Sequence, residues 1–436
     1  MIILVYFARC HANPLLILLW PYYCASRRDT FMGNFSLYIT LFLSISLWFG
    51  LICWSKRNTL YFRYLFIAAL LVGLQCRISY LITTPTFYAP DEQSHFNYIK
   101  YLSENLSLPV QTSKVYAPTN DYEYYQPPLY YMAMVPIYCV SKTLFHEEFL
   151  IVRGIRSFSI LLWLINIWLG LRFFRHLKIS NDFLRIAFIV LICLLPTYTF
   201  MSSVINNDNL LITIGGAILC IVAQKDYALR KSILIGFLLG VAMLTKLSAI
   251  VYFPLVIVMF GFEIVKNRKD RISLVSHLVL ILTIAVVVFA PWAIRNWYLY
   301  KSITALNIGS IPVYWPSISN GIISSLGYMS HSFWAVSGIY NKISSYFSVI
   351  GILVTFFAII GLIYCVVLKS KYFLTIFSEE NWEFCIAMAV GIIINVLLVL
   401  RYGLLYGQGQ GRFLFPISLF IVFGLGSYPV KNATSM

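Results

Sequence analysis

Apolar segments alternate with short polar turns along most of this chain, and the alternation predicts a bundle of membrane-spanning helices. Most of the segments are close to the roughly 20 residues that a helix needs to cross a bilayer. The strands of a membrane β-barrel would instead show a weak alternation over about ten residues. We therefore expect about eleven spans, at residues 35–54, 64–84, 150–171, 184–204, 209–224, 232–246, 248–265, 273–293, 346–368, 384–402 and 413–429.

The composition agrees with this pattern. Of the 436 residues, 60% are hydrophobic and 11% are charged, which is more apolar surface than a soluble protein can bury. The predicted fold class is therefore an all-α polytopic membrane protein. The net charge of +16 would suggest a nucleic-acid partner for a soluble protein, but here it follows from membrane orientation, so no nucleic acid is expected.

Basic residues cluster at alternate turns, which indicates the side of the membrane that each turn faces. Cytoplasmic loops carry an excess of Lys and Arg. The clusters are Lys56, Arg57 and Arg63; Arg172, Arg175 and Lys178; Lys225, Arg230 and Lys231; Lys266, Arg268, Lys269 and Arg271; and Lys369 with Lys371. Assigning them to the cytoplasm puts Asp91 on the outer face. We expect a bacterial inner (plasma) membrane protein with an extracytoplasmic site.

Two long segments, 85–149 and 295–345, are predicted to lie on the outer face. Within the first of them, residues 129–145 begin after two prolines and are flanked by tyrosines. Pro at the start of a helix and Tyr at the membrane surface are typical of an interfacial helix. The first outer loop is therefore expected to contain helices that lie on the membrane.

The chain is predicted to have two parts. Residues 1–59 form an N-terminal segment with one or two spans, and both Met1 and Met32 are open as its start. This segment lacks the charge pattern and the clear cleavage site of a signal peptide. Residues 60–430 are expected to form the transmembrane catalytic domain, including both outer loops.

Residues 85–131 of the first outer segment contain five carboxylates, at Asp91, Glu92, Glu104, Asp121 and Glu123. Asp91 and Glu92 follow Pro90 at the mouth of a predicted membrane helix, where packing explains a carboxylate pair poorly. An ordinary solvated start of a loop explains the pair alone equally well. The nearby His95 and the basic residues at later helix ends favour a functional site.

Three basic residues lie at membrane depth or at the outer ends of predicted spans, where an ionisable group needs a partner or a function. Lys246 interrupts an apolar run, and it either extends to the outer surface, pairs with a helix terminus, or balances the charge of an anionic lipid head group. Arg412 and Arg295 stand at the outer ends of two other spans. A guanidinium there suits bidentate contact with phosphate oxygens, and simple anchoring at the interface explains it as well.

Two further sets of polar residues have weaker signals. Asn207 and Asp208 belong to an Asx-rich turn; capping of the next helix is the default interpretation, and hydrogen bonding to sugar hydroxyls is the second. His95 follows Asp91 by one helical turn, and a divalent cation held by His95 with Asp91 or Glu92 is not favoured, because one His and two acids are a weak metal pattern. The nine cysteines show no metal-ligand spacing. We expect no cofactor and no metal.

Several short motifs occur in a characteristic order: Pro90-Asp91-Glu92 with His95, Gln126-Pro127-Pro128-Leu129-Tyr130-Tyr131, Pro291-Trp292 with Arg295-Asn296, Ser332-Phe333-Trp334, and Gln410-Gly411-Arg412-Phe413-Leu414-Phe415-Pro416. This series resembles a family of bacterial membrane proteins within the GT-C glycosyltransferase superfamily. Protein O-mannosyltransferases and the aminoarabinose transferases of lipid A are more distant relatives. The likeness covers residues 60 to 430.

The resemblance implies a GT-C-like helical bundle in which an acid at the outer end of the first conserved helix is the catalytic base. Asp91 matches that position, and Glu92 would assist it. Gln126 stands where the relatives usually carry His or Lys. The substrate-binding candidates are His95, Gln126, Tyr130, Asn207, Asp208 and Trp334.

The resulting hypothesis is an inverting glycosyltransferase of cell-envelope polysaccharide biosynthesis. Its donor would be a polyprenyl-phosphate sugar, and its acceptor a hydroxyl of a surface glycan or lipid. Asp91 would accept the proton of the attacking hydroxyl, while Arg412, Lys246 and Arg295 would bind the donor phosphate. A polysaccharide polymerase or ligase is the alternative. A transporter of a lipid-linked substrate is less favoured, because no inverted repeat is visible.

Overall fold

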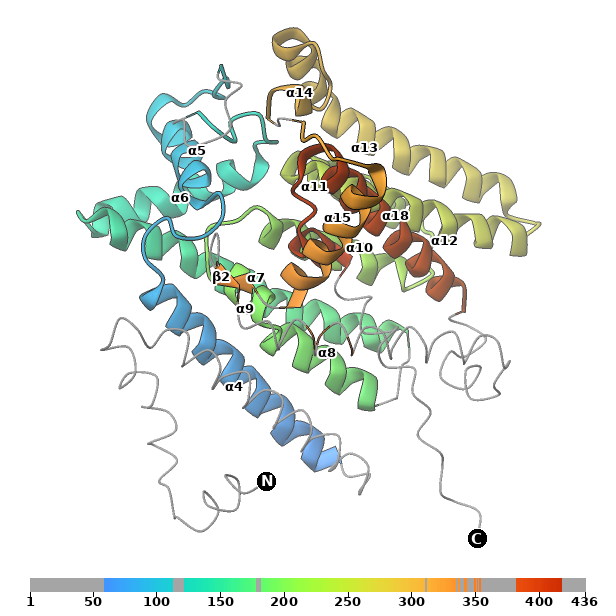
Figure 1. Cartoon of the computed structure of the whole chain (residues 1–436). Coiled ribbons are helices and arrows are strands. Elements are labelled where there is room, and N and C mark those ends of the chain that lie inside the picture. The colour runs from blue at the N-terminus through green and yellow to red at the C-terminus, as the bar shows by residue number, and fades with distance from the viewer. Residues whose placement is uncertain are drawn as a thin grey trace. The chain divides into compact units, whose positions relative to one another are not determined.

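A computed structural model describes residues 59–112, 121–177, 182–309, 312–334, 336–337, 341–342, 349, 351, 353 and 382–417 (Figure 1). The chain divides into two compact units, Met1–Arg57 and Asn58–Met436, and the described residues all belong to the second. The expected spans 35–54 and 346–368, and most of 413–429, lie outside the described residues.

The described part is helical apart from two short strands. The elements are α4 Thr59–Thr83, α5 Glu92–Asn105, α6 Leu129–Leu144, α7 Glu148–His176, α8 Asp182–Leu194, α9 Pro196–Met201, α10 Asp208–Val222, α11 Leu229–Thr245, the 3₁₀ helix η2 Leu247–Val251, α12 Tyr252–Lys266, α13 Arg271–Tyr300, α14 Leu306–Gly309, α15 Ile318–Trp334, β1 Val336–Ser337, β2 Asn341–Lys342, α18 Trp382–Tyr406 and the 3₁₀ helix η3 Gly411–Ile417. β1 and β2 pair antiparallel.

Five described helices are long and apolar enough to cross a membrane: Leu65–Thr83, Glu148–His176, Leu247–Lys266, Arg271–Tyr300 and Glu383–Tyr406. They support the prediction of a helical membrane protein, whereas the count of eleven spans stays a prediction. One expected span, 184–204, is interrupted at Pro196, which separates α8 from α9. The segment predicted as an interfacial helix forms α6, with nearly the expected bounds.

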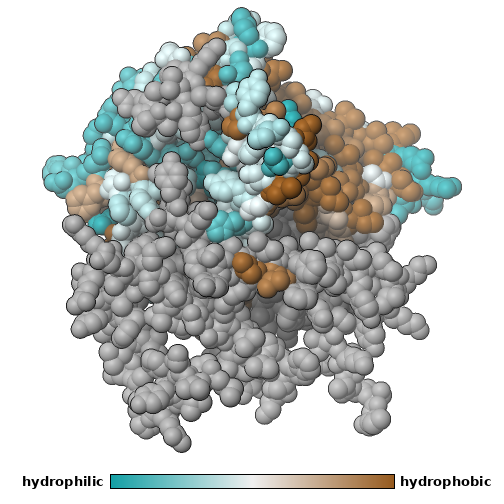
Figure 2. All heavy atoms as spheres, viewed as in Figure 1, coloured by the Kyte–Doolittle hydropathy of each residue, from teal (hydrophilic) through white to brown (hydrophobic). Residues whose placement is uncertain are grey.

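Helix pairs that are distant in sequence pack together within this unit. α11 lies along α13, α10 packs on α7, and α12 packs on α18 (Figure 1). Apolar side chains are exposed along α13 and α18, including Val286, Val287, Ile393 and Leu397. Figure 2 shows this apolar surface at the right, whereas the part that contains α5 is largely hydrophilic. This distribution is typical of a protein with a lipid-facing belt.

The break between α8 and α9 is stabilised by one buried arginine. Pro196 has no N–H, so the carbonyl of Ile192 four residues earlier loses its helical partner. Arg77 Nη2 and Trp163 Nε1 donate to that carbonyl at 3.0 and 2.8 Å. Arg77 Nη1 donates to the Cys193 carbonyl at 2.8 Å, and the guanidinium lies 3.9 Å from the centroid of the Trp163 ring. Arg77 therefore joins α4 to the interrupted helix.

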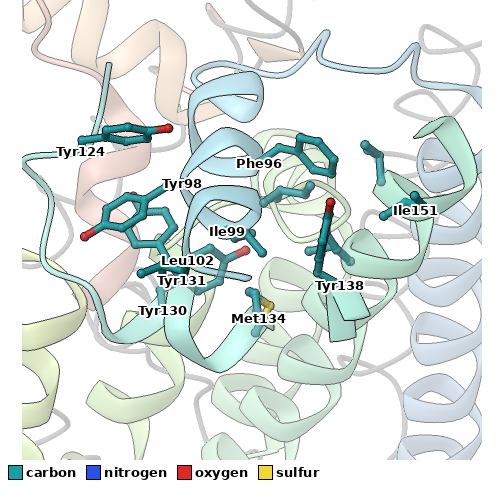
Figure 3. Close-up of a cluster of buried hydrophobic side chains, with 13 residues drawn as sticks. Phe96, Tyr98, Ile99, Leu102, Tyr124, Tyr130, Tyr131, Met134, Tyr138 and Ile151 are labelled. Carbon is teal, nitrogen blue, oxygen red and sulfur yellow. The ribbon is translucent and has the colours of Figure 1, made fainter. Parts of the chain in front are cut away.

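The segment between α4 and α7 has an aromatic core of its own between α5 and α6 (Figure 3). Tyr98 and Tyr131 stack with their ring centroids 3.9 Å apart. Met134 and Ile99 are fully buried beside them. Buried aromatic side chains contribute strongly to packing energy, so this core holds α5 in a fixed position at the end of α4.

We expect Arg77→Met to destabilise the protein by about 1–3 kcal/mol, because it removes several buried hydrogen bonds, including those to the Ile192 and Cys193 carbonyls. Thermal unfolding of the detergent-solubilised protein measures this loss. Arg175→Met, at an exposed position on α7, is the matched control and is expected to stay within about 0.5 kcal/mol of the wild type. Equal melting temperatures for the two variants would contradict the role of Arg77.

Candidate active site

Asp91 occupies the N-cap position of α5 but does not cap the helix. Its backbone is left-handed (φ 61°), and its side chain makes no capping hydrogen bond. Oδ2 instead accepts a hydrogen bond from Arg412 Nη2 at 2.7 Å. A left-handed conformation costs a residue other than glycine roughly 1–2 kcal/mol. Asp91 is therefore held toward Arg412, and the interpretation of a plain solvated loop start does not account for this geometry.

Arg412 reaches Asp91 from η3 because the chain approaches α15 closely just before it. A Cβ atom on Gly411 would collide with the backbone of Met329 and Phe333. The Gly411 N–H donates to Ser332 Oγ at 2.7 Å. Glycine is thus required at this position, and the contact fixes where the next side chain begins.

Arg412 retains hydrogen-bonding capacity after it pairs with Asp91. The residue is 6% exposed, and its Nε and Nη1 atoms have no hydrogen-bond partner. Unpartnered buried donors are costly, and guanidinium N–H groups suit the oxygens of a phosphate or carboxylate. The side chain therefore presents two donors to a further anionic or polar group.

Lys246 forms a second ion pair next to the first. Its backbone is extended between α11 and η2, and Nζ lies 2.6 Å from Asp208 Oδ1 at the start of α10. Asp208 Oδ2 and both side-chain polar atoms of Asn207 are buried without a partner. Asn207 occupies the N-cap position of α10, as expected, but its side chain makes no capping hydrogen bond; Asn206 Oδ1 instead accepts the Asp208 N–H at 2.7 Å.

His95 and Glu123 lie close enough to these ion pairs for their pKa values to respond to them. Burial, together with Lys246 and Arg412, lowers the pKa of His95 to about 4, and Asp91 and Asp208 only partly oppose them. His95 is therefore neutral at pH 7, and its Nδ1 lies 2.9 Å from Tyr131 Oη. The structure thus gathers Asp91, His95, Glu123, Lys246 and Arg412 from separate segments.

The pKa of Asp91 is governed by the same neighbours. Burial favours the neutral acid, but Arg412, His95 and Lys246 together hold the pKa of this carboxyl below its usual value. The side chain is 30% exposed. Asp91 is therefore an ionised, accessible carboxylate at neutral pH.

Glu92 is a structural residue, contrary to the expectation of a catalytic role. Its two oxygens accept from Arg156 Nε and Nη2 at 2.8 and 2.7 Å, and Oε1 also accepts from the Ile205 N–H at 3.1 Å. Arg156 donates further to the carbonyls of Thr84 and Pro85. Glu92 is fully buried, so it fixes the loop on α7 and offers no free oxygen for chemistry.

Four other predicted residues have contacts of different kinds. Arg295 donates to the Pro109 carbonyl at 2.5 Å and therefore holds the outer loop. Tyr130 Oη accepts from the Asn206 N–H at 3.1 Å in the buried core. Gln126 hydrogen-bonds Glu123. Trp334 packs on Phe333. Of the four, Gln126 alone contacts a residue of the gathered group.

Glu123 is the residue that sequence reasoning missed. It was visible as one of five loop carboxylates, but nothing in the sequence distinguishes it from Glu104 or Asp121. In the structure it is 5% exposed, and its Oε2 has no hydrogen-bond partner. Among the described residues, no group of three His, Cys, Asp or Glu side chains is arranged to hold a metal ion.

Comparison of the chain with protein-family models, with curated proteins and with solved structures finds no match. The resemblance to GT-C enzymes therefore depends on the short motifs, and the function proposed below depends on the motifs together with the geometry of the gathered residues.

We expect Glu92→Gln to cost about 3–5 kcal/mol of folding stability, because it leaves the buried Arg156 charge without its partner. Thermal unfolding in detergent measures the loss. Glu104→Gln is the matched control, since the Glu104 pair with Lys142 is exposed and contributes about 0–1 kcal/mol. A Glu92→Gln protein that is as stable as the control would show that the pair does not hold the loop.

Proposed function

We propose that this protein is an integral-membrane inverting glycosyltransferase that transfers a sugar from a polyprenyl phosphate to a hydroxyl of a surface glycan or lipid. The observation that carries the proposal is the pairing of Asp91 with Arg412, whose remaining buried donors lack partners. The pair combines a group that can take a proton with a group that can bind a phosphate. The active site would face the extracytoplasmic side of a bacterial inner membrane.

In the proposed reaction, Asp91 accepts the proton of the attacking hydroxyl and must come within hydrogen-bond distance of it. The hydroxyl oxygen forms a bond to the anomeric carbon, and the bond between that carbon and the phosphate oxygen breaks. The electron pair leaves with the lipid phosphate. Inversion requires the base and the leaving group on opposite faces of the sugar.

The two cations would stabilise the charge that develops on the phosphate. Nε and Nη1 of Arg412 have no partner, so each can donate to a phosphate oxygen, and Lys246 supplies a point charge nearby. Arg295 is a weaker candidate for this role: its Nη1 has no hydrogen-bond partner, but its Nη2 donates to the Pro109 carbonyl and it pairs with none of the site carboxylates. A cationic site of this kind can bind a phosphate without a metal ion.

A polysaccharide polymerase or ligase is the second candidate, since it would use the same lipid-phosphate donor chemistry. A transporter is less well supported. Asp91, Lys246 and Arg412 lie outside the five candidate spans of the described chain, whereas transporters bind substrate near the bilayer midplane.

We expect Asp91→Asn to lower sugar transfer by at least about 100-fold, because it preserves shape and removes the general base. The assay follows labelled sugar from membrane polyprenyl phosphates into surface glycan. Asp226→Asn, in an exposed ion pair with Lys231, is the matched control. Undiminished transfer by Asp91→Asn at normal protein level would exclude Asp91 as the base.

We expect Arg412→Lys to weaken binding of a farnesyl methyl phosphodiester at least about tenfold, because lysine keeps the charge but not the fork of donors. Binding is measured by isothermal titration in detergent, with farnesol as the uncharged control ligand. If Arg412→Lys and the wild type bind the diester equally, Arg412 does not contact the phosphate. If the wild type binds the diester no more tightly than farnesol, the phosphate site itself is refuted.

A further inference from the structure

We propose that Glu123 helps to bind the polyprenyl-phosphate sugar. In this role Glu123 is a neutral carboxylic acid that donates a hydrogen bond to the phosphate of that substrate. This inference rests on the function proposed above and names the partner of one carboxyl group within the same site.

The backbone directs Glu123 into the site at a conformational cost. Its φ is 71°, in the left-handed region, and Asp91 has the same conformation with φ 61°. Such a conformation costs a residue other than glycine of order 1–3 kcal/mol and commonly marks a functional position. Two carboxylates held this way face one set of cations, which is the geometric reason to assign both of them to the site.

Glu123 has no cation of its own among the described residues. The two nearest positive groups are already paired, Arg412 with Asp91 and Lys246 with Asp208. Its Oε2 is buried without a hydrogen-bond partner, and Gln126 provides its one side-chain hydrogen bond. An unpaired buried carboxylate is strongly disfavoured, whereas the protonated acid is not.

The surroundings of Glu123 favour a proton on it. Burial and the nearby Asp91 raise its pKa to about 7, and Lys246, Gln126 and Arg412 only partly oppose them. The phenol groups of Tyr125 and Tyr131 lie close enough to respond to its charge.

A phosphate brought against Arg412 would add a negative charge and raise this pKa further. The bound state therefore takes up a proton, and the protonated carboxyl becomes a donor, as buried acids do in other enzymes.

The test is the pH dependence of binding of the farnesyl methyl phosphodiester between about pH 6 and pH 9, a range in which the diester keeps one charge and His95 stays neutral. Because the diester raises the pKa of Glu123, the affinity for the diester is highest at pH values below the pKa that Glu123 has in the ligand-free protein. The affinity falls at pH values above that pKa. We expect the wild type to lose up to about tenfold in affinity per pH unit above pH 7.

Glu123→Gln remains a neutral hydrogen-bond donor, so it is expected to bind at all these pH values about as tightly as the wild type does at low pH. Glu123→Ala is expected to bind weakly and without pH dependence. Glu104→Gln, which alters an exposed carboxylate of the same outer segment, should retain the wild-type slope.

A flat wild-type profile, or an unchanged slope in Glu123→Gln, would overturn the inference while leaving the phosphate site intact. Weak binding by Glu123→Gln at every pH would also overturn it, because it would mean that the carboxylate form is the one required. Failure of the wild type to bind the diester at any pH would instead refute the proposed phosphate site.

Discussion

The ion pair between Asp91 and Arg412 joins the segment that follows α4 to the last described segment, and the candidate site depends on it. Removing two charges from water costs several kcal/mol, and their attraction offsets this only when the geometry is good and the other polar atoms are satisfied. Here the geometry is good, at 2.7 Å, but two donors of Arg412 are unsatisfied. A pair kept for stability alone would be expected to have its donors filled.

The neighbouring acids Asp91 and Glu92 show how the fold divides structural and chemical roles. Glu92 is anchored by Arg156 on α7 and by the backbone of Ile205, so the backbone at this point cannot move freely. With that anchor and the aromatic core of α5 and α6, the backbone of Asp91 can be held in a left-handed conformation. A site whose reacting groups are fixed in advance loses less free energy to reorganisation during the reaction.

The sequence predicts part of this arrangement because part of it is local. Hydropathy over 20 residues is sufficient to find α7, α12, α13 and α18 within a few residues, and two prolines mark the start of α6. The sequence shows Pro196, but the apolar residues on both sides of it favour a single helix over 184–204. Nothing near Pro196 in the sequence indicates that the distant Arg77 donates to the carbonyls that the break leaves without helical partners. The helix breaks only because tertiary contacts compensate it.

The site was less predictable, because its pairings join residues up to 321 positions apart. Asp91, Lys246 and Arg412 can each be chosen as candidate site residues from the sequence, since charges near membrane helices need an explanation. The sequence does not indicate which residues pair with them. Arg156 carried the same signal in the interior of a predicted span and was overlooked, although its position indicated a buried anion. Glu123 offered no local signal, because its burial follows from the fold of the loop around it.

The two ion pairs suggest how such a site could distinguish its ligand. Without a ligand, each cation has a carboxylate, so a small free anion gains little by entering. A polyprenyl phosphate differs because each buried CH₂ of its chain contributes about 0.8 kcal/mol, which can offset the desolvation of the phosphate. Arg412 can then bind the phosphate with its free nitrogens while it keeps Asp91, whereas Lys246 offers a single point charge. On this argument the lipid chain supplies the affinity, and the paired charges supply the position of the reacting groups.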